Sequence, residues 1–245
     1  MEMSLLSPTI IGLGLFAILT ASISTFAGMG GGVLLFAVMG TVFPLTVVVP
    51  VHGLVQFISN GHRCLMLKPY LKASIIKPFI PGAIIGAALS ALLIKSGLSP
   101  KVAMFLLVLL IAYTLFKPKK LSLPLPHQKG FFWLGLATGL LGMLVGAVDP
   151  ILSPFFLRDD LSKEEVIANK TALQFFVHAL KIPVFLGLGF DYIEFSGLMI
   201  MLILASLIGN KMGYHLLKFI TPRVFQMIFK VALFGVGIRM TFMLF

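Results

Sequence analysis

Two apolar segments of the sequence carry polar side chains at matching intervals. The two series are His52, Gln56, Asn60 and Arg63, then Lys170, Gln174, His178 and Lys181. Each series follows the spacing i, i+4, i+8 and i+11, which keeps its members within roughly 80° of one face of an α-helix. Imidazoles, amides and cations can donate hydrogen bonds to an oxyanion. The pattern therefore predicts two helix faces that line a path for a small anion.

The polar faces also have a simpler interpretation. Arg63 and Lys181 lie near the expected helix ends, where long basic side chains can reach out to the membrane surface. His52 could form a hydrogen bond within the helix bundle. Polar residues in membrane helices nevertheless usually face the bundle interior or a cavity. We therefore expect the remaining polar residues of the two series to bind substrate: His52, Gln56, Asn60, Lys170, Gln174 and His178.

A glycine run interrupts the first apolar segment. Its five residues, Gly28, Met29, Gly30, Gly31 and Gly32, are expected to contribute to the same substrate site. Glycine lets the backbone turn sharply and approach a ligand closely. The short helix that follows would present unpaired N–H groups and the positive end of its dipole, which attract anions. Alternatively, the glycines serve close packing between helices.

Asp149 is the one carboxylate that the sequence places at membrane depth. Buried there, it must be neutral or paired, and Lys170 is a candidate partner. It could relay a proton with His52 or His178, which would couple transport to protons. It could also cap a short helix that begins at Pro150, since Asp before Pro fits the N-cap and N1 positions. The two roles are compatible.

The composition requires a lipid environment. Of 245 residues, 59% are hydrophobic and only 11% are charged, with a mean hydropathy of +1.08. Long apolar runs favour helices over the alternating strands of a barrel. The net charge of +11 is concentrated in short connections, which follows the positive-inside rule rather than the basic stripe of a nucleic-acid binder. Cys64 is the single cysteine, so we expect no disulfide, and no metal or other cofactor is indicated.

Breaks and apolar runs predict the helices. The expected segments are Pro8–Ala27, Val33–Val42, Leu45–Ser59, Ser74–Ile94, Val102–Phe116, Phe131–Val145, Ile151–Leu157, Val166–Leu188, Ile193–Leu217 and Val224–Phe245. Loop charge places the central linker in the cytoplasm and the loop 187–194 outside. Val166–Leu188 supplies the one crossing between them, so the piece 131–157 must enter the membrane and return to the same side. Its length, about 40 Å as helix, is too short for two crossings of a core of about 30 Å. We therefore expect a hairpin of two partial helices, bent at a break in each half.

The two halves match at a constant offset. Adding 118 carries Gly28 onto Gly146 and Gln56 onto Gln174, and adding 122 carries Tyr70 onto Tyr192. The connection at 63–77 is basic, whereas its counterpart at 187–194 is acidic, so the copies have opposite orientations. We predict an all-α polytopic membrane protein of two inverted repeats, residues 1–120 and 121–245. Each repeat is expected to have a broken-helix hairpin and three spanning helices.

The glycine run 28–32, the Pro44 region and Tyr70, with the second break at Gly146 and Tyr192, resemble the sulfite exporter TauE/SafE family of membrane permeases. The resemblance covers nearly the whole chain, although Gly146–Pro150 replaces a second glycine-rich run. It implies export of sulfite or organosulfonates across a bacterial inner membrane by a multi-pass carrier rather than an enzyme. An anion channel, or a transporter of another small anion such as a carboxylate, is the alternative. A homo-oligomer is compatible with this architecture.

Overall fold

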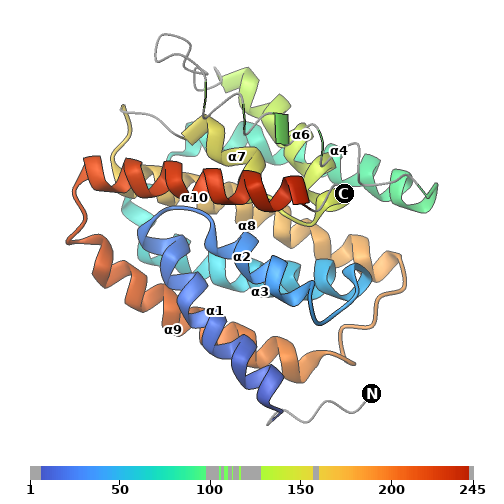
Figure 1. The fold of residues 1–245 in the computed structure, drawn as a ribbon. Helices are drawn as coiled ribbons and strands as arrows, with labels where there is room; N and C mark the ends of the chain where they lie inside the picture. Colours follow the sequence, from blue (N-terminus) through green and yellow to red (C-terminus); the bar gives the residue numbers. More distant parts are fainter. Residues whose placement is uncertain are drawn as a thin grey trace.

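The helices are arranged around the two polar segments, which lie together at the centre of the molecule (Figure 1). The computed structural model describes residues 7–97, 128–156 and 160–242, together with residues 105, 108, 109, 112 and 116. Most of the expected helix Val102–Phe116 and the linker after it lie outside the described residues. The described chain is helical throughout, which confirms the predicted all-α class.

The described elements follow the predicted order. They are α1 (Pro8–Phe26), α2 (Gly31–Met39), α3 (Leu45–Met66), the 3₁₀ turn η1 (Lys68–Tyr70), α4 (Ala73–Lys95), α6 (Gln128–Val145), α7 (Asp149–Phe156), α8 (Lys163–Gly187), α9 (Ser196–Leu217) and α10 (Pro222–Phe242). The main difference is at α3, which continues past the predicted end at Ser59 to Met66. Arg63 therefore belongs to the helix and continues its polar face.

Helices α3 and α8 pack against each other in the middle of the bundle. On one side α3 contacts α9, which runs along α1, and on the other side α8 contacts α4, which runs along α6 (Figure 1). The contacts thus form two outer pairs around one central pair. This arrangement holds the polar faces of α3 and α8 against each other.

Three described helices, α1, α4 and α9, are long and apolar enough to cross a membrane. Helices α3 and α8, with 22 and 25 residues, are also long enough to cross a membrane, but their polar faces lower their hydropathy. The broken segments are unequal: α1 and α6 have 19 and 18 residues, whereas α2 and α7 have 9 and 8. A rise of 1.5 Å per residue gives the longer limbs about 28 Å, close to a full crossing. The expectation of two partial helices thus holds only for α2 and α7.

Local sequence signals explain where the helices begin. Ser7 caps α1 by accepting a hydrogen bond from Ile10 N–H, at 3.3 Å, and Pro8 occupies the first turn. Ser162 and Glu165 form a reciprocal capping box at the start of α8. Thr221, directly before Pro222 at the start of α10, accepts from Val224 N–H at 3.4 Å. Each cap satisfies amides that the helix itself leaves unpaired.

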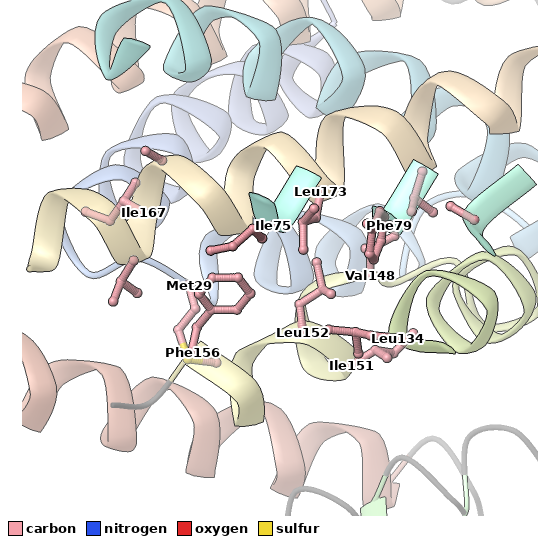
Figure 2. Close-up of a cluster of buried hydrophobic side chains, with 14 of the residues drawn as sticks. Met29, Ile75, Phe79, Leu134, Val148, Ile151, Leu152, Phe156, Ile167 and Leu173 are labelled. Carbon is pink, nitrogen blue, oxygen red and sulfur yellow. The ribbon is translucent and has the colours of Figure 1, made fainter. Parts of the chain in front are cut away.

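A buried apolar cluster lies among α4, α6, α7 and α8 (Figure 2). Phe79 of α4, Leu152 and Phe156 of α7 and Leu173 of α8 contribute to it, and all are nearly inaccessible. Met29, from the glycine run, joins the same cluster. The packing of these side chains fixes the short helix α7 against α8, and thereby the position of Asp149 at its start.

Two buried asparagines tie distant segments together. Asn210 of α9 donates to the Ser59 carbonyl of α3, at 2.9 Å, and accepts from Thr25 of α1, at 3.0 Å. Asn169 of α8 accepts from the amide of Lys72, at 2.7 Å, and donates to the carbonyl of Tyr70. A buried amide side chain finds few other hydrogen-bond partners inside an apolar bundle, so these bonds fix the register of neighbouring helices.

Glycines allow α4 and α6 to approach backbone to backbone. A Cβ atom added at Gly86 would lie 2.2 Å from the carbonyl oxygen of Leu136, and one at Gly139 would lie 2.3 Å from that of Ala83. Contacts this short are impossible for real side chains. Small residues at membrane helix interfaces permit such close packing.

We expect Gly86→Ala to cost about 1–3 kcal/mol of stability, because α4 and α6 must separate to admit the methyl group. The matched control is Gly12→Ala, since nothing lies within 4 Å of a Cβ atom at that position of α1. Thermal unfolding in detergent should show a lower melting temperature for Gly86→Ala alone. Equal melting temperatures would contradict the observed packing.

Candidate functional site

The glycine break between α1 and α2 adopts a backbone that other residues rarely reach. Gly28 and Gly30 have φ angles of 77° and 91°, and Gly146, at the break between α6 and α7, has 81°. Gly31 is required for another reason, because a Cβ atom there would lie 1.7 Å from the carbonyl oxygen of Thr20. The turn thus brings the start of α2 back against α1 and exposes its first amides toward α7.

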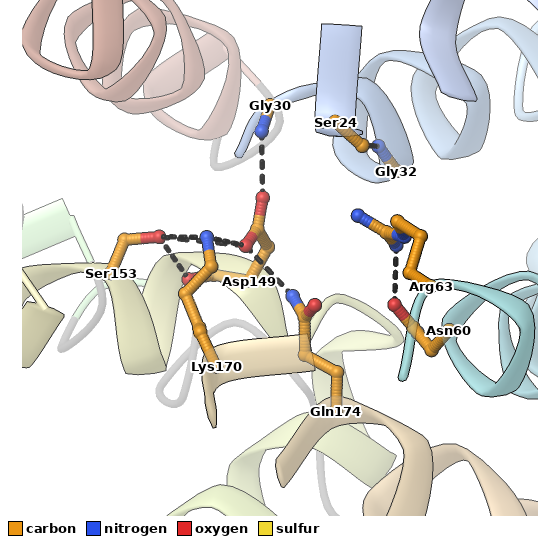
Figure 3. A network of polar contacts seen from close by, with 9 residues as sticks. All are labelled: Ser24, Gly30, Gly32, Asn60, Arg63, Asp149, Ser153, Lys170 and Gln174. Atoms are coloured by element: carbon orange, nitrogen blue, oxygen red, sulfur yellow. Dashed lines mark hydrogen bonds and ion pairs between the residues drawn. The ribbon is translucent and has the colours of Figure 1, made fainter. Parts of the chain in front are cut away.

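Asp149 lies opposite this break and accepts hydrogen bonds from three directions (Figure 3). Its Oδ2 accepts from Gly30 N–H at 2.7 Å. Its Oδ1 accepts from Lys170 Nζ at 2.6 Å and from Gln174 Nε2 at 2.7 Å. Lys170 also donates to Ser153 Oγ at 3.2 Å. The predicted pairing of Asp149 with Lys170 is confirmed.

The structure changes the expected capping role of Asp149. Helix α7 begins at Asp149 itself rather than at Pro150. The carboxylate bonds across the interface to Gly30 and α8, so it satisfies the start of α2 rather than the start of its own helix. Ser24 acts beside it, accepting a hydrogen bond from Gly32 N–H at 3.1 Å. The exposed amides of the break are therefore held by side chains of the protein.

Both polar faces point inward. All eight members of the two series are buried: His52, Gln56, Asn60, Arg63, Lys170, Gln174, His178 and Lys181. The alternative in which the basic ends reach the membrane surface is wrong, since Arg63 is 3% and Lys181 0% exposed. Lys181 Nζ instead donates to the carbonyl oxygen of Gly146 at 2.6 Å, at the second break.

Arg63 is the cation that the sequence analysis left out of the site. Its Nη2 donates to Oδ1 of Asn60, whereas its Nε and the Nδ2 of Asn60 have no partner. The continuous spacing from His52 through Asn60 was the signal that could have found it. The sequence analysis placed Arg63 on this helix face but assigned it to the membrane surface, because it lies near the expected helix end.

Two imidazoles meet between α3 and α8. The ring centroids of His52 and His178 are 5.9 Å apart, with an edge-to-face geometry. His52 Nε2 lies 2.8 Å from the carbonyl oxygen of Gly32, so this nitrogen carries a proton and donates it. The Nδ1 atoms of both rings are buried without a partner. Together they offer sites that a proton or a ligand donor could occupy.

A small cavity connects these groups. Its wall includes Arg63 and most of the predicted binding residues, namely Met29, Gly32, His52, Gln56, Asp149, Gln174 and His178. The cavity measures about 10 Å³, room for about one water molecule. Buried polar atoms are normally satisfied, so the unpaired nitrogens of Arg63, His52 and His178 at this cavity indicate a polar ligand.

The other predicted residues lie around the cavity. Lys170 and the backbone amide of Gly30 both donate hydrogen bonds to the Asp149 carboxylate. Asn60 accepts a hydrogen bond from the Arg63 guanidinium. Gly31 packs against α1, and Gly28 lies against Phe225 of α10, so these two shape the turn. Met29 mainly packs in the apolar cluster (Figure 2).

Charge and ligand chemistry favour an anion at this site. Among the described residues, the buried ionisable side chains in and around the cavity wall are basic except for Asp149. They are Arg63, Lys170, Lys181 and the imidazoles of His52 and His178. Isolated charges are costly in an apolar interior, so an excess of basic groups is stabilised by a bound anion. In the part of the chain that the structure describes, no three His, Cys, Asp or Glu residues come together as a metal site.

These features define a multi-pass helical membrane protein whose buried, basic site lies between interrupted helices. The sequence matches the family model of the sulfite exporter TauE/SafE over residues 13–240. The protein belongs to this family of membrane transporters and is not an enzyme; its partners are a small anionic substrate and membrane lipid. No curated protein and no solved structure matches the sequence.

We expect Lys170→Met to destabilise the protein by about 3–5 kcal/mol, because it leaves the Asp149 carboxylate buried without its counter-ion. The double variant Asp149→Asn with Lys170→Met should recover much of this loss, since no buried charge remains unpaired. Thermal unfolding of the single and double variants measures both effects. Additive losses in the double variant would contradict the ion pair.

Proposed function

We propose that the protein is a secondary transporter that exports sulfite or organosulfonates across a bacterial inner membrane, with the anion bound at Arg63. The supporting observation is the buried guanidinium, whose Nε lacks a partner beside the cavity. Guanidinium groups bind oxyanions through short, charge-assisted hydrogen bonds. Asn60 orients the guanidinium and adds its own unpaired Nδ2.

The surroundings of Arg63 suit a small, partly hydrogen-bonded anion. Gln56, Gln174 and the two imidazoles lie along the same cavity wall. The volume of about 10 Å³ is too small for an oxyanion, so the site must widen when one binds. This requirement favours a carrier over a channel, because a channel needs a continuous open path. We also propose proton coupling, since Asp149 is a buried carboxylate of this cavity.

We propose that residues 1–120 and 121–245 are inverted repeats that move against each other around this site. The pairing of α1 with α9 corresponds to that of α6 with α4, and α3 with α9 corresponds to α8 with α4. Gly28 and Gly146 have similar positive φ angles, 77° and 81°, at the two breaks. Inverted repeats with interrupted helices place substrates near the midplane between the repeats. Assembly into a homo-oligomer stays a prediction.

An inverted arrangement predicts that the equivalent loops 63–77 and 187–194 lie on opposite sides of the membrane. In a Cys64→Ala background, we expect Lys68→Cys to react with an impermeant maleimide only from the cytoplasmic side. Glu194→Cys should react from the external side, because its loop carries Asp191 and Glu194 without a basic residue. Both positions are exposed. Labelling of intact cells and of inverted vesicles measures this, and labelling from one shared side would contradict the inverted repeat.

We expect Arg63→Gln to weaken anion binding by about 10- to 100-fold, because it removes a charge-assisted contact of about 1.5–3 kcal/mol. The measurement is thermal stabilisation of the purified protein by sulfite, methanesulfonate, sulfate and acetate, since a ligand of the folded state raises its melting temperature. Arg223→Gln, an exposed arginine at the start of α10, is the matched control.

Three results decide this proposal. Stabilisation by sulfite or methanesulfonate that Arg63→Gln alone removes supports the assigned site. Stabilisation that survives Arg63→Gln means that the anion binds elsewhere. Preference for acetate over both sulfur-containing anions would favour a carboxylate transporter of the same fold.

A further inference from the structure

Three hydrogen-bond donors that the sequence predicted for a substrate anion donate instead to a carboxylate of the protein itself. Gly30 N–H, at the start of α2, and Lys170 and Gln174, on α8, all donate to the Asp149 carboxylate. A helix N-terminus, an ammonium group and an amide form a typical oxyanion site. The side chain of Asp149 therefore occupies the place where a sulfite or sulfonate group would fit.

The substrate position at Arg63 opens into the same cavity as this carboxylate. An anion at Arg63 would thus lie close to the charge of Asp149, in surroundings from which water is largely excluded. Lys170 pairs with this carboxylate at 2.6 Å, so a substrate anion competes with Asp149 for the same donors. A proton on Asp149 ends this competition, because a neutral carboxyl group holds ammonium and amide donors less strongly. A protonated carboxyl group also gains an O–H that can donate to the anion.

We propose that the anion and one proton bind together and cross the membrane in the same direction, with Asp149 as the proton site. This inference rests on the proposed anion transport. The proton enters from the side that supplies the anion and attaches to a carboxylate oxygen of Asp149. The neutral carboxyl group then releases Gln174 and the amide of Gly30, which turn to the anion. The cavity widens as these contacts open, and the proton leaves with the anion on the other side.

Other charged and titratable groups face Asp149 and must be separated from it. Helix α8 contributes Lys170 and His178, and α3 contributes Arg63 and His52. Helix α2 contributes the backbone amide of Gly30, and α6 and α10 add no described titratable side chain to the cavity wall. His52 and His178 are the alternative proton acceptors through their unpaired Nδ1 atoms. Replacement of the carboxylate alone distinguishes these possibilities.

The test counts protons taken up when methanesulfonate binds to the purified protein. This sulfonate stays ionised between about pH 5 and about pH 9, so any proton taken up belongs to the protein. Calorimetry in two buffers with different ionisation enthalpies gives the number of protons per anion. We expect uptake approaching one proton per anion, and an affinity that falls by up to about tenfold per pH unit over the pH range in which this uptake is measured.

Asp149→Asn keeps the shape of the side chain and removes the titrating group. We expect this variant to bind methanesulfonate with an affinity independent of pH and without proton uptake. Glu194→Gln, an exposed carboxylate of the α8–α9 loop, should behave as the unmodified protein. Proton uptake that persists in Asp149→Asn would overturn the assignment and point to His52 or His178.

A second measurement uses the unmodified protein, so it does not depend on whether a variant folds. In proteoliposomes with an internal pH dye, an inward methanesulfonate gradient should acidify the interior. Alkalinisation, or anion flux without proton movement, would overturn the shared direction of transport. If methanesulfonate and sulfite neither bind nor move, the proposed function fails as well. Anion binding without proton uptake refutes this inference and the proposed proton coupling, whereas the proposed anion transport stands.

Discussion

An ion pair in an apolar interior, between Asp149 and Lys170, constrains the structure around it. A carboxylate at this depth is stable only if every hydrogen bond it can accept is supplied. The donors come from α8 and, across the interface, from the amide of Gly30. The start of α2, the start of α7 and the middle of α8 must therefore meet at one point.

This meeting explains the interrupted helices. A continuous helix satisfies its own amides and has none to offer a side chain, whereas a broken helix exposes its first turn. The positive φ angles at Gly30 and Gly146 direct these turns toward the centre. Lys181 completes the arrangement at the second break by donating to the Gly146 carbonyl. The protein thus uses side chains to satisfy both breaks, and Arg63 is left with an unpaired nitrogen beside the cavity.

The sequence predicted the polar faces because helical periodicity is a local property. A spacing of four residues places His52, Gln56 and Asn60 on one side of a helix wherever that helix lies. Arg63 was expected to reach the membrane surface because it lies near the predicted helix end, whereas α3 continues to Met66 and Arg63 is buried. At Asp149 the predicted pairing with Lys170 is confirmed, but the capping role is not, since the carboxylate accepts hydrogen bonds from Gly30 and α8 instead of from the start of its own helix.

The sequence by itself determined the membrane class, the helices, the two breaks and the inward polar faces. These follow from hydropathy, periodicity and glycine, which act within a few residues of the chain. Only the tertiary structure decided which donors remain available to a ligand. Lys170 and Gly30, both expected to bind substrate, are engaged by Asp149, whereas Arg63 keeps an unpaired nitrogen at the cavity. The physical reason is that the hydrogen bonds of Asp149 with Lys170, 21 positions away, and with Gly30, 119 positions away, depend on packing, which local patterns do not encode.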